Sequence, residues 1–207
     1  MRIKAVALLA ALVLTVGFAV PIWADPIVTV DQQYNPPSHC CAYQIVGLES
    51  GQGFTPTLTG LDAVLLGLWD HPGSAAITGG VYRVNIRQGS SAGAILGSSG
   101  EVPIPDGFDS RFDGLVHFDF SARVPLVPGS LYVIQPERVS GEDLYWFGHW
   151  PNPYAGGTSW IRGASNDNID LVFVEGLHET SAVPEPASLL LFGTGLVGLR
   201  AWRKRRS

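Results

Sequence analysis

The stretch Val81-Tyr82-Arg83-Val84-Asn85-Ile86-Arg87 indicates the fold class, because its side chains alternate in character from one residue to the next. In an extended chain successive side chains point to opposite faces, so Tyr82, Val84 and Ile86 share one apolar face. We therefore predict a β-strand whose even-numbered side chains face a core. Val116-His117-Phe118-Asp119-Phe120 alternates in the same way, and its apolar members are predicted to face that core too.

Similar apolar and β-branched runs recur through the chain, separated by Gly, Pro, Asp and Ser. They predict strands at 61–69, 131–135, 144–148 and 169–175, with weaker candidates at 52–57, 94–98 and 158–161. No segment between residues 25 and 183 has a helical period of useful length. Eight or nine short strands in about 160 residues predict an all-β fold, an antiparallel β-sandwich of the jelly-roll type.

The first residues have the pattern of an export signal. Arg2 and Lys4 precede an apolar run at 5–20, and Ala24 is a small residue of the kind found before a signal peptidase cut. We predict a signal peptide over residues 1–24, read by the general secretion machinery, with cleavage after Ala19 as the alternative. The mature domain is then expected over residues 25–182, in an exported protein.

The last residues combine three features that point to a membrane. Val183-Pro184-Glu185-Pro186-Ala187-Ser188 is followed by an apolar run at 189–199. The prolines exclude helix from the residues before them, so this strip is expected to be extended and accessible to a protease. A helix over 187–199 spans roughly 20 Å against about 30 Å of hydrocarbon, which makes it a marginal anchor. A basic stop signal that resists crossing the inner membrane is predicted at Arg200, Arg203, Lys204, Arg205 and Arg206.

Residues 183–206 resemble the PEP-CTERM sorting signal, a Pro-Glu-Pro strip before a short apolar helix and an arginine-rich end. The resemblance implies that an exosortase recognises Pro184, Glu185 and Pro186 and cuts nearby, in a Gram-negative bacterium that makes exopolysaccharide. The chain would pass through an inner-membrane intermediate to the cell surface or extracellular matrix. An ordinary C-terminal anchor that is never cut is the alternative. The third segment of the chain is therefore 183–207.

The middle of the chain has a looser resemblance, carried by short motifs in a fixed order. They include Gly53-Phe54-Thr55-Pro56, Val127-Pro128-Gly129-Ser130-Leu131-Tyr132 and Asp170-Leu171-Val172-Phe173. Over residues 44–175 the chain is similar to the jelly-roll modules of bacterial surface proteins called choice-of-anchor domains. This resemblance implies a sandwich fold and no defined activity.

The charge of the expected domain excludes one class of partner. Between residues 25 and 183 there are six arginines and no lysine against seventeen acidic residues, a net charge near −11. Such a surface repels polyphosphates, so nucleic acid is not expected to bind. Cys40 and Cys41 are adjacent and cannot join distant loops, so a vicinal disulfide, bonds to other chains and two thiols remain open.

An aromatic-rich stretch at 145–154 offers a binding hypothesis. Trp150, Tyr154 and the nearby Trp160 could stack on sugar rings, which would make the domain a carbohydrate-binding module for exopolysaccharide. The alternative is packing, because alternate aromatic residues of a strand face the core.

Acidic loops offer a second hypothesis, structural calcium, since calcium takes six to eight oxygen ligands. The candidate ligands are Asp106, Asp109 and Asp113 in one loop, or Asp167 and Asp170 in another. Asp and Asn are also common in ordinary turns, and no other cofactor is expected. The chain has no His-Glu-x-x-His motif, and we predict a non-enzymatic surface or matrix protein.

Overall fold

The computed structural model describes residues 28–37, 42–46, 49–70, 79–151 and 154–178 of the 207-residue chain. The described part is nearly all β, as predicted. Its elements are β1 (Val28–Tyr34), β2 (Ala42–Ile45), β3 (Gly51–Phe54), β4 (Gly60–Leu66), β5 (Leu68–Trp69), β6 (Gly80–Gln88), β7 (Ile95–Ser98), β8 (Val102–Ile104), α2 (Ser110–Asp113), β9 (Val116–Pro125), β10 (Tyr132–Gly141), β11 (Tyr145–His149), β12 (Ser159–Ile161), β13 (Ala164–Asn166), β14 (Asp170–Leu171) and β15 (Phe173–His178).

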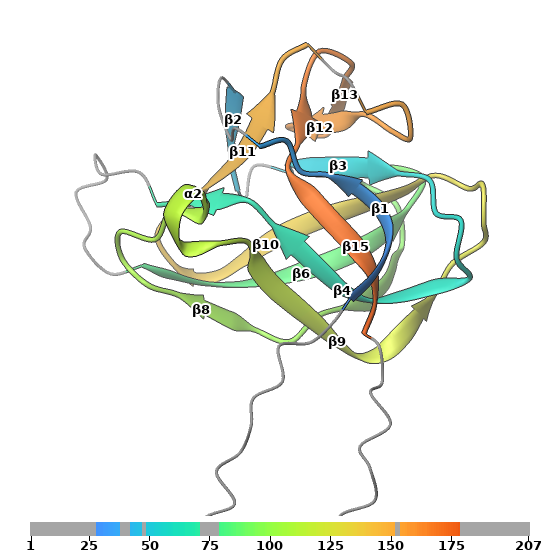
Figure 1. Ribbon diagram of the computed structural model, residues 1–207, viewed down its shortest axis with the longest axis horizontal. Coiled ribbons are helices and arrows are strands. Elements are labelled where there is room, and N and C mark those ends of the chain that lie inside the picture. Colours follow the sequence, from blue (N-terminus) through green and yellow to red (C-terminus); the bar gives the residue numbers. More distant parts are fainter. Residues whose placement is uncertain (1–27, 38–41, 47–48, 71–78, 152–153, 179–207) are drawn as a thin grey trace, which may run out of the picture.

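The strands form three antiparallel sheets (Figure 1). The first sheet has the order β1-β15-β4-β9. The second runs β13-β12-β3-β10-β6-β7, with β8 also paired to β6. A small third sheet, β14-β11-β2 with β5 added to β11, lies at one end of the molecule. The prediction of an antiparallel sandwich is therefore confirmed.

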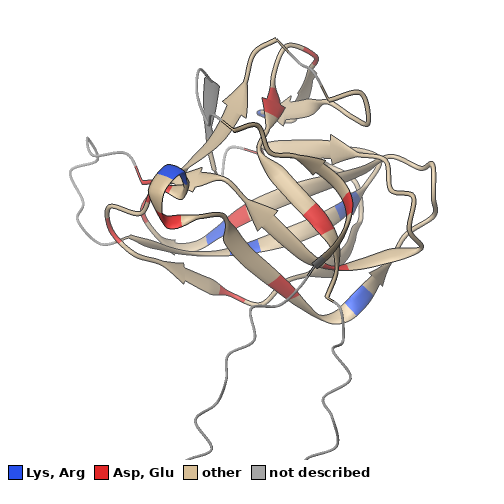
Figure 2. Ribbon diagram, in the orientation of Figure 1, with Lys and Arg blue, Asp and Glu red and all other residues tan. Residues whose placement is uncertain are grey.

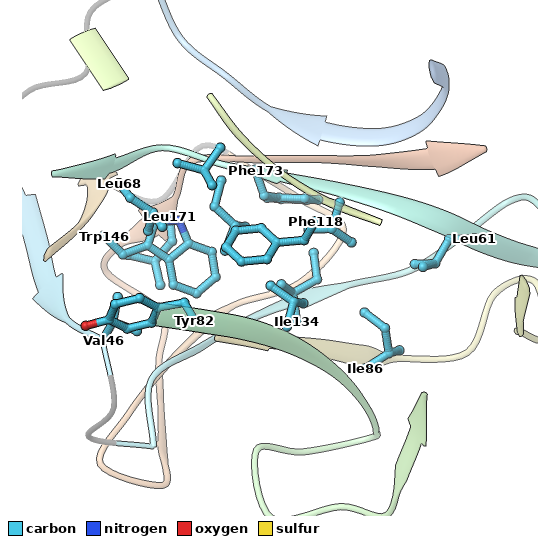
Figure 3. Close-up of a cluster of buried hydrophobic side chains, with 14 of the residues drawn as sticks. Val46, Leu61, Leu68, Tyr82, Ile86, Phe118, Ile134, Trp146, Leu171 and Phe173 are labelled. Atoms are coloured by element: carbon cyan, nitrogen blue, oxygen red, sulfur yellow. The ribbon is translucent and has the colours of Figure 1, made fainter. Parts of the chain in front are cut away.

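The apolar core lies between the first two sheets, where the alternating stretches place it. Tyr82, Val84 and Ile86 are fully buried, and Phe118 of the facing sheet is buried with them (Figure 3). Burying the Tyr82 hydroxyl requires partners. This hydroxyl accepts a hydrogen bond from the Leu144 N–H at 3.0 Å and donates one to the Glu142 carbonyl. The predicted inward faces of residues 81–87 and 116–120 are thus confirmed.

The expected single strand at 61–69 is divided in two at Gly67, which differs from the prediction. The Gly67 N–H donates to the Val172 carbonyl at 3.1 Å, and Val172 in turn separates β14 from β15. A side chain at Gly67 would start 2.8 Å from Cγ1 of Val172, so only glycine allows this approach. At this corner both chain segments pass between the first and third sheets.

Four of the strands, β1, β2, β8 and β13, were not predicted from the sequence, and a one-turn helix was not predicted either. The helix α2 begins after Asp109, whose side chain accepts a hydrogen bond from the Arg111 N–H at 2.9 Å. This is ordinary N-capping.

The two strands at the limits of the domain are neighbours. β1 pairs with β15 so that Val28 lies opposite His178 and Thr29 opposite Leu177. β1 therefore begins and β15 ends at the same end of the sandwich, opposite the end that carries the third sheet (Figure 1). We call the end that holds Val28 and His178 the terminal end.

Candidate functional site

The acidic loop at 106–113 does not gather its three aspartates. Asp109 caps α2 and Asp113 ends it: Asp109 pairs with the Arg111 guanidinium, and Asp113 Oδ2 accepts a hydrogen bond from the Asp109 N–H at 2.9 Å. Asp106 is exposed and lies apart from both, in a cluster with two other acids. Asp109 and Asp113 therefore form local hydrogen bonds that stabilise the helical turn.

The second acidic loop also separates its two candidates. Asp167 is exposed and accepts a hydrogen bond from the Thr158 hydroxyl at 2.9 Å. Asp170 is fully buried, where it accepts bonds from the Gln52 side-chain amide at 3.2 Å and the Tyr154 N–H at 2.6 Å. Burial raises the pKa of Asp170 despite these two donors. Asp170 thus ties β14 to β3.

Asp70, Asp106 and Glu142 form the group of carboxylates in the described residues that could hold a metal ion. Their ligand oxygens lie within 4.8 Å of one another. Each residue follows a strand end: Asp70 follows β5, Asp106 comes after β8, and Glu142 follows β10. Oxygen ligands at this separation suit a hard cation such as calcium.

Ionising all three acids of this cluster is unfavourable, because two of them are buried and their charges repel one another. Asp70 is 5% exposed and Glu142 is 8% exposed. Burial raises the pKa of Asp70, and the neighbouring charges of Glu142 and Asp106 raise it further. Backbone donors offset part of this cost: the Gly107 N–H lies 2.7 Å from Asp70 Oδ2, and the Gly79 N–H lies 3.1 Å from Glu142 Oε1.

A hollow of about 470 Å³ adjoins this carboxylate cluster. It is lined by the start of β6, by β8 and by the end of β10, including Pro105 and Gly141, which directly precede Asp106 and Glu142. The adjacent Asp143 points elsewhere and pairs with Arg138 at 2.6 Å. Sequence spacing could not identify the cluster, because folding brings its three members together from separate parts of the chain.

Asp106→Asn is expected to raise the thermal midpoint of unfolding by about 2 °C in the presence of EDTA, because it removes one of three like charges. Differential scanning calorimetry of the full chain in detergent would measure this. Asp167→Asn, another exposed aspartate, is the control and should change the midpoint less. A lower midpoint for Asp106→Asn in EDTA would contradict the expected repulsion, whereas stabilisation of the unsubstituted chain by calcium that the variant lacks would identify a cation site.

The three aromatic residues predicted to bind glycans lie in different surroundings. Trp150 follows β11 and is 62% exposed. Tyr154 packs edge-on against Phe173, with ring centroids 5.2 Å apart, and its hydroxyl donates to Gln32 Oε1 at 3.1 Å. Trp160 lies on β12, is partly buried, and its indole N–H is buried without a partner in the described residues. Of the three, Trp150 is the one that offers an open ring.

A second aromatic cluster was not expected from the sequence. Trp69 stacks on Phe147 at 5.7 Å and contacts Tyr145 at 5.8 Å, and the Arg111 guanidinium lies 5.1 Å from the Trp69 ring. Asp109 holds Arg111 in this position. Cation–π contacts of this kind join α2 to the third sheet. The alternation at 145–147 places Tyr145 and Phe147 on one face of the strand, but no sequence signal links that face to Arg111.

The predicted processing residues lie outside the described residues. This applies to Ala24, to Pro184, Glu185 and Pro186, and to the basic residues from Arg200 to Arg206. Cys40 and Cys41, whose pairing was left open, also lie outside the described residues. Among the helices that the structure describes, none is both long and apolar enough to cross a membrane.

Comparison with known families identifies the C-terminal segment. Residues 182–206 match the PEP-CTERM protein-sorting motif, which confirms the resemblance seen in the sequence. No curated protein matches the chain. The motif implies exosortase as the processing partner and export toward the cell surface.

Proposed function

We propose that the chain is a surface or matrix protein that an exosortase cuts at Pro184-Glu185-Pro186, leaving the β-sandwich with a non-enzymatic role in the envelope or exopolysaccharide. The match to the sorting motif at residues 182–206 carries this proposal. The motif begins four residues after the last residue of β15, so the sandwich is the part that remains after a cut. A signal peptide over residues 1–24 and an inner-membrane intermediate complete the proposed route.

The polar contacts of the sandwich support a structural role. Glu137 accepts hydrogen bonds from Arg83 at 2.7 Å and from Asn85 at 2.7 Å, and Asp119 pairs with His178 at 2.7 Å. The Glu137 contacts join the neighbouring strands β10 and β6, and the Asp119–His178 contact joins β9 to β15 across β4. Figure 2 shows the acidic residues spread over several elements of the sandwich, which suits a soluble exported domain.

Intact-mass analysis of the protein recovered from cells with and without the exosortase tests the proposal. The expected result is loss of the mass that follows about Pro186, only in cells that contain the enzyme. Recovery of the full-length chain in both strains would overturn the proposed processing. A screen of the recovered domain on polysaccharides tests the non-enzymatic role, since release of shorter sugars would contradict it.

Carbohydrate binding is the second candidate function, and the exposure of Trp150 favours it. Trp150 directly follows β11, and the last residue of that strand, His149, lies opposite Asp170 in the pairing of β11 with β14. Asp170 comes eight residues before His178, which lies at the terminal end. A domain attached through its C-terminal residues would therefore present Trp150 away from the attachment. An exposed indole can stack on the apolar face of a sugar ring.

Trp150→Ala is expected to weaken exopolysaccharide binding about fivefold if this second function holds, because one stacking contact is worth roughly 1 kcal/mol. Affinity electrophoresis of the exported protein in gels containing the host polysaccharide would measure the change. Phe112→Ala is the matched control, since Phe112 is an 83% exposed aromatic residue on α2. Equal retardation of the unsubstituted protein and the Trp150 variant would rule out Trp150 as a glycan contact.

A further inference from the structure

The two ends of the described domain lie on neighbouring strands. Val28 of β1 is paired with His178 of β15, and paired strands are about 4.8 Å apart. The predicted signal peptide ends at Ala24, four residues before Val28, and the sorting motif begins at residue 182, four residues after His178. Both expected membrane segments are therefore joined by only a few residues to the terminal end of the sandwich.

The sorting strip has little room to move away from this end. Pro184 is six residues beyond His178, and a fully extended chain spans about 3.5 Å per residue. The two residues are thus separated by at most about 21 Å. An enzyme that holds Pro184-Glu185-Pro186 in its active site must come equally close to the sandwich.

Contacts at the terminal end hold β15 in its sheet, so its residues do not detach and lengthen the link between the sandwich and Pro184. β15 lies inside its sheet, hydrogen-bonded to β1 on one side and β4 on the other. The His178 N–H donates to Asp62 Oδ1 of β4 at 2.6 Å, and its Nε2 lies 2.7 Å from Asp119 Oδ1 of β9. Peeling β15 away would break these contacts and two strand pairings, so the short reach is a property of the folded domain.

We propose that the terminal end of the sandwich, where Asp62, Asp119 and His178 meet, is the surface that docks on the exosortase during processing. The inference rests on the proposed function. The enzyme is the partner because its active site must reach a strip tethered within about 21 Å of this end. The docked orientation leaves the third sheet at the end of the sandwich away from the enzyme (Figure 1), and Trp150 directly follows β11 of that sheet.

Site-specific photocrosslinking of the full chain in cells tests the inference. A photoreactive residue replaces Ser121, which is exposed on β9 two residues beyond Asp119. The matched control replaces Ser165, exposed on β13 at the opposite end. A tagged, catalytically inactive exosortase retains its substrate, and antibodies against both proteins identify the product. We expect a crosslink to the exosortase from Ser121 and none from Ser165.

A spacer gives a second measurement. About 20 Gly and Ser residues inserted between Thr180 and Ser181 add a typical span of ~25 Å, which would free the enzyme from the domain. We expect the Ser121 crosslink to be lost from this variant, while active exosortase still cuts it.

The outcomes separate the two claims. Normal cutting of the unsubstituted chain with no Ser121 crosslink, with equal crosslinks from both serines, or with crosslinks to lipid alone would overturn the docking inference and leave the proposed function standing. Absence of any exosortase-dependent cutting would overturn both. A Ser121 crosslink that survives the spacer would also contradict docking imposed by the short tether.

Discussion

Glu175→Gln is expected to abolish a loss of stability that the unsubstituted domain shows as the pH rises from about 5 to 8. Glu175 lies on β15, fully buried, and neither of its carboxyl oxygens accepts a hydrogen bond of normal geometry from the described residues. Burial first, and then the nearby charge of Asp31 and a hydrogen bond that requires the proton, raise the pKa of Glu175 to about 8.

The pKa of Asp31, unlike that of Glu175, is lowered, so its carboxylate stays ionised. Burial alone would raise its pKa, but hydrogen bonds from Thr57 and Leu58 outweigh that effect and lower it. The N–H groups of Thr57 and Leu58 each lie 2.9 Å from Asp31 Oδ2. Asp31 sits at the irregularity in the pairing of β1 with β15, directly before Gln32, the partner of Glu175. A protonated Glu175 beside an ionised Asp31 therefore stabilises the contact between the two strands.

The direction of the pH effect follows from proton binding. The pKa of Glu175 is higher in the folded than in the unfolded state, where it is near 4.5. Between pH 4.5 and about 8 the folded state keeps a proton that the unfolded state releases, so the free energy of unfolding falls by about 1.4 kcal/mol per pH unit. The contribution is fully present below pH 4.5 and is lost by about pH 8.

Urea unfolding of the processed protein at pH 5 to 8 would measure this slope. Because glutamine cannot ionise, the free energy of unfolding of the variant should rise relative to that of the unsubstituted protein as the pH rises. Glu137→Gln is the control, because Glu137 is 40% exposed in its pair with Arg83 and should leave the slope unchanged. An unsubstituted domain whose stability stays flat from pH 5 to 8 would show that Glu175 ionises normally.

The alternation of single strands was enough to predict the sandwich and its inner faces. Residues 81–87 and 116–120 each present one apolar face, and the core is built from those faces. The strand break at Gly67 was not predictable, because a nearly continuous apolar run has no period that shows where a chain changes sheets. The sequence did not predict β1, because Asp31-Gln32-Gln33 interrupts its apolar pattern. The pairing with β15 stabilises this segment as a strand.

The candidate sites were less predictable than the fold. In the sequence, Asp170 lies in a stretch rich in turn-forming residues. In the structure it is buried, and its carboxylate accepts hydrogen bonds from the side chain of Gln52, which is distant in sequence, and from the Tyr154 N–H. Asp106 was identified as an acid that could hold a cation, but its neighbours Asp70 and Glu142 come from distant strand ends. Residue type can be read locally, whereas a cluster depends on which strand ends the topology brings together.

Replacing both Pro184 and Pro186 with alanine is expected to leave the chain uncut and retained in the membrane fraction. Proline denies the preceding residue a helical conformation and removes a backbone donor. With alanine, the apolar helix expected over 187–199 can extend backward through Glu185, which would withdraw these peptide bonds from an enzyme that needs an extended strip. Intact mass and cell fractionation, with active exosortase present, would measure the effect.

The control for this change keeps the number of substitutions equal. Pro125 and Pro128 are exposed in the sandwich, at the end of β9 and in the turn that follows it, and their double replacement with alanine should leave cutting unaffected. Glu185→Gln separates charge from conformation, because it retains both prolines and removes only the carboxylate. If the double variant at 184 and 186 is cut as efficiently as the unsubstituted chain, an extended backbone at the strip is unnecessary. Loss of cutting in the proline variant alone would assign recognition to the backbone, and loss in both variants would add the carboxylate to what the enzyme reads.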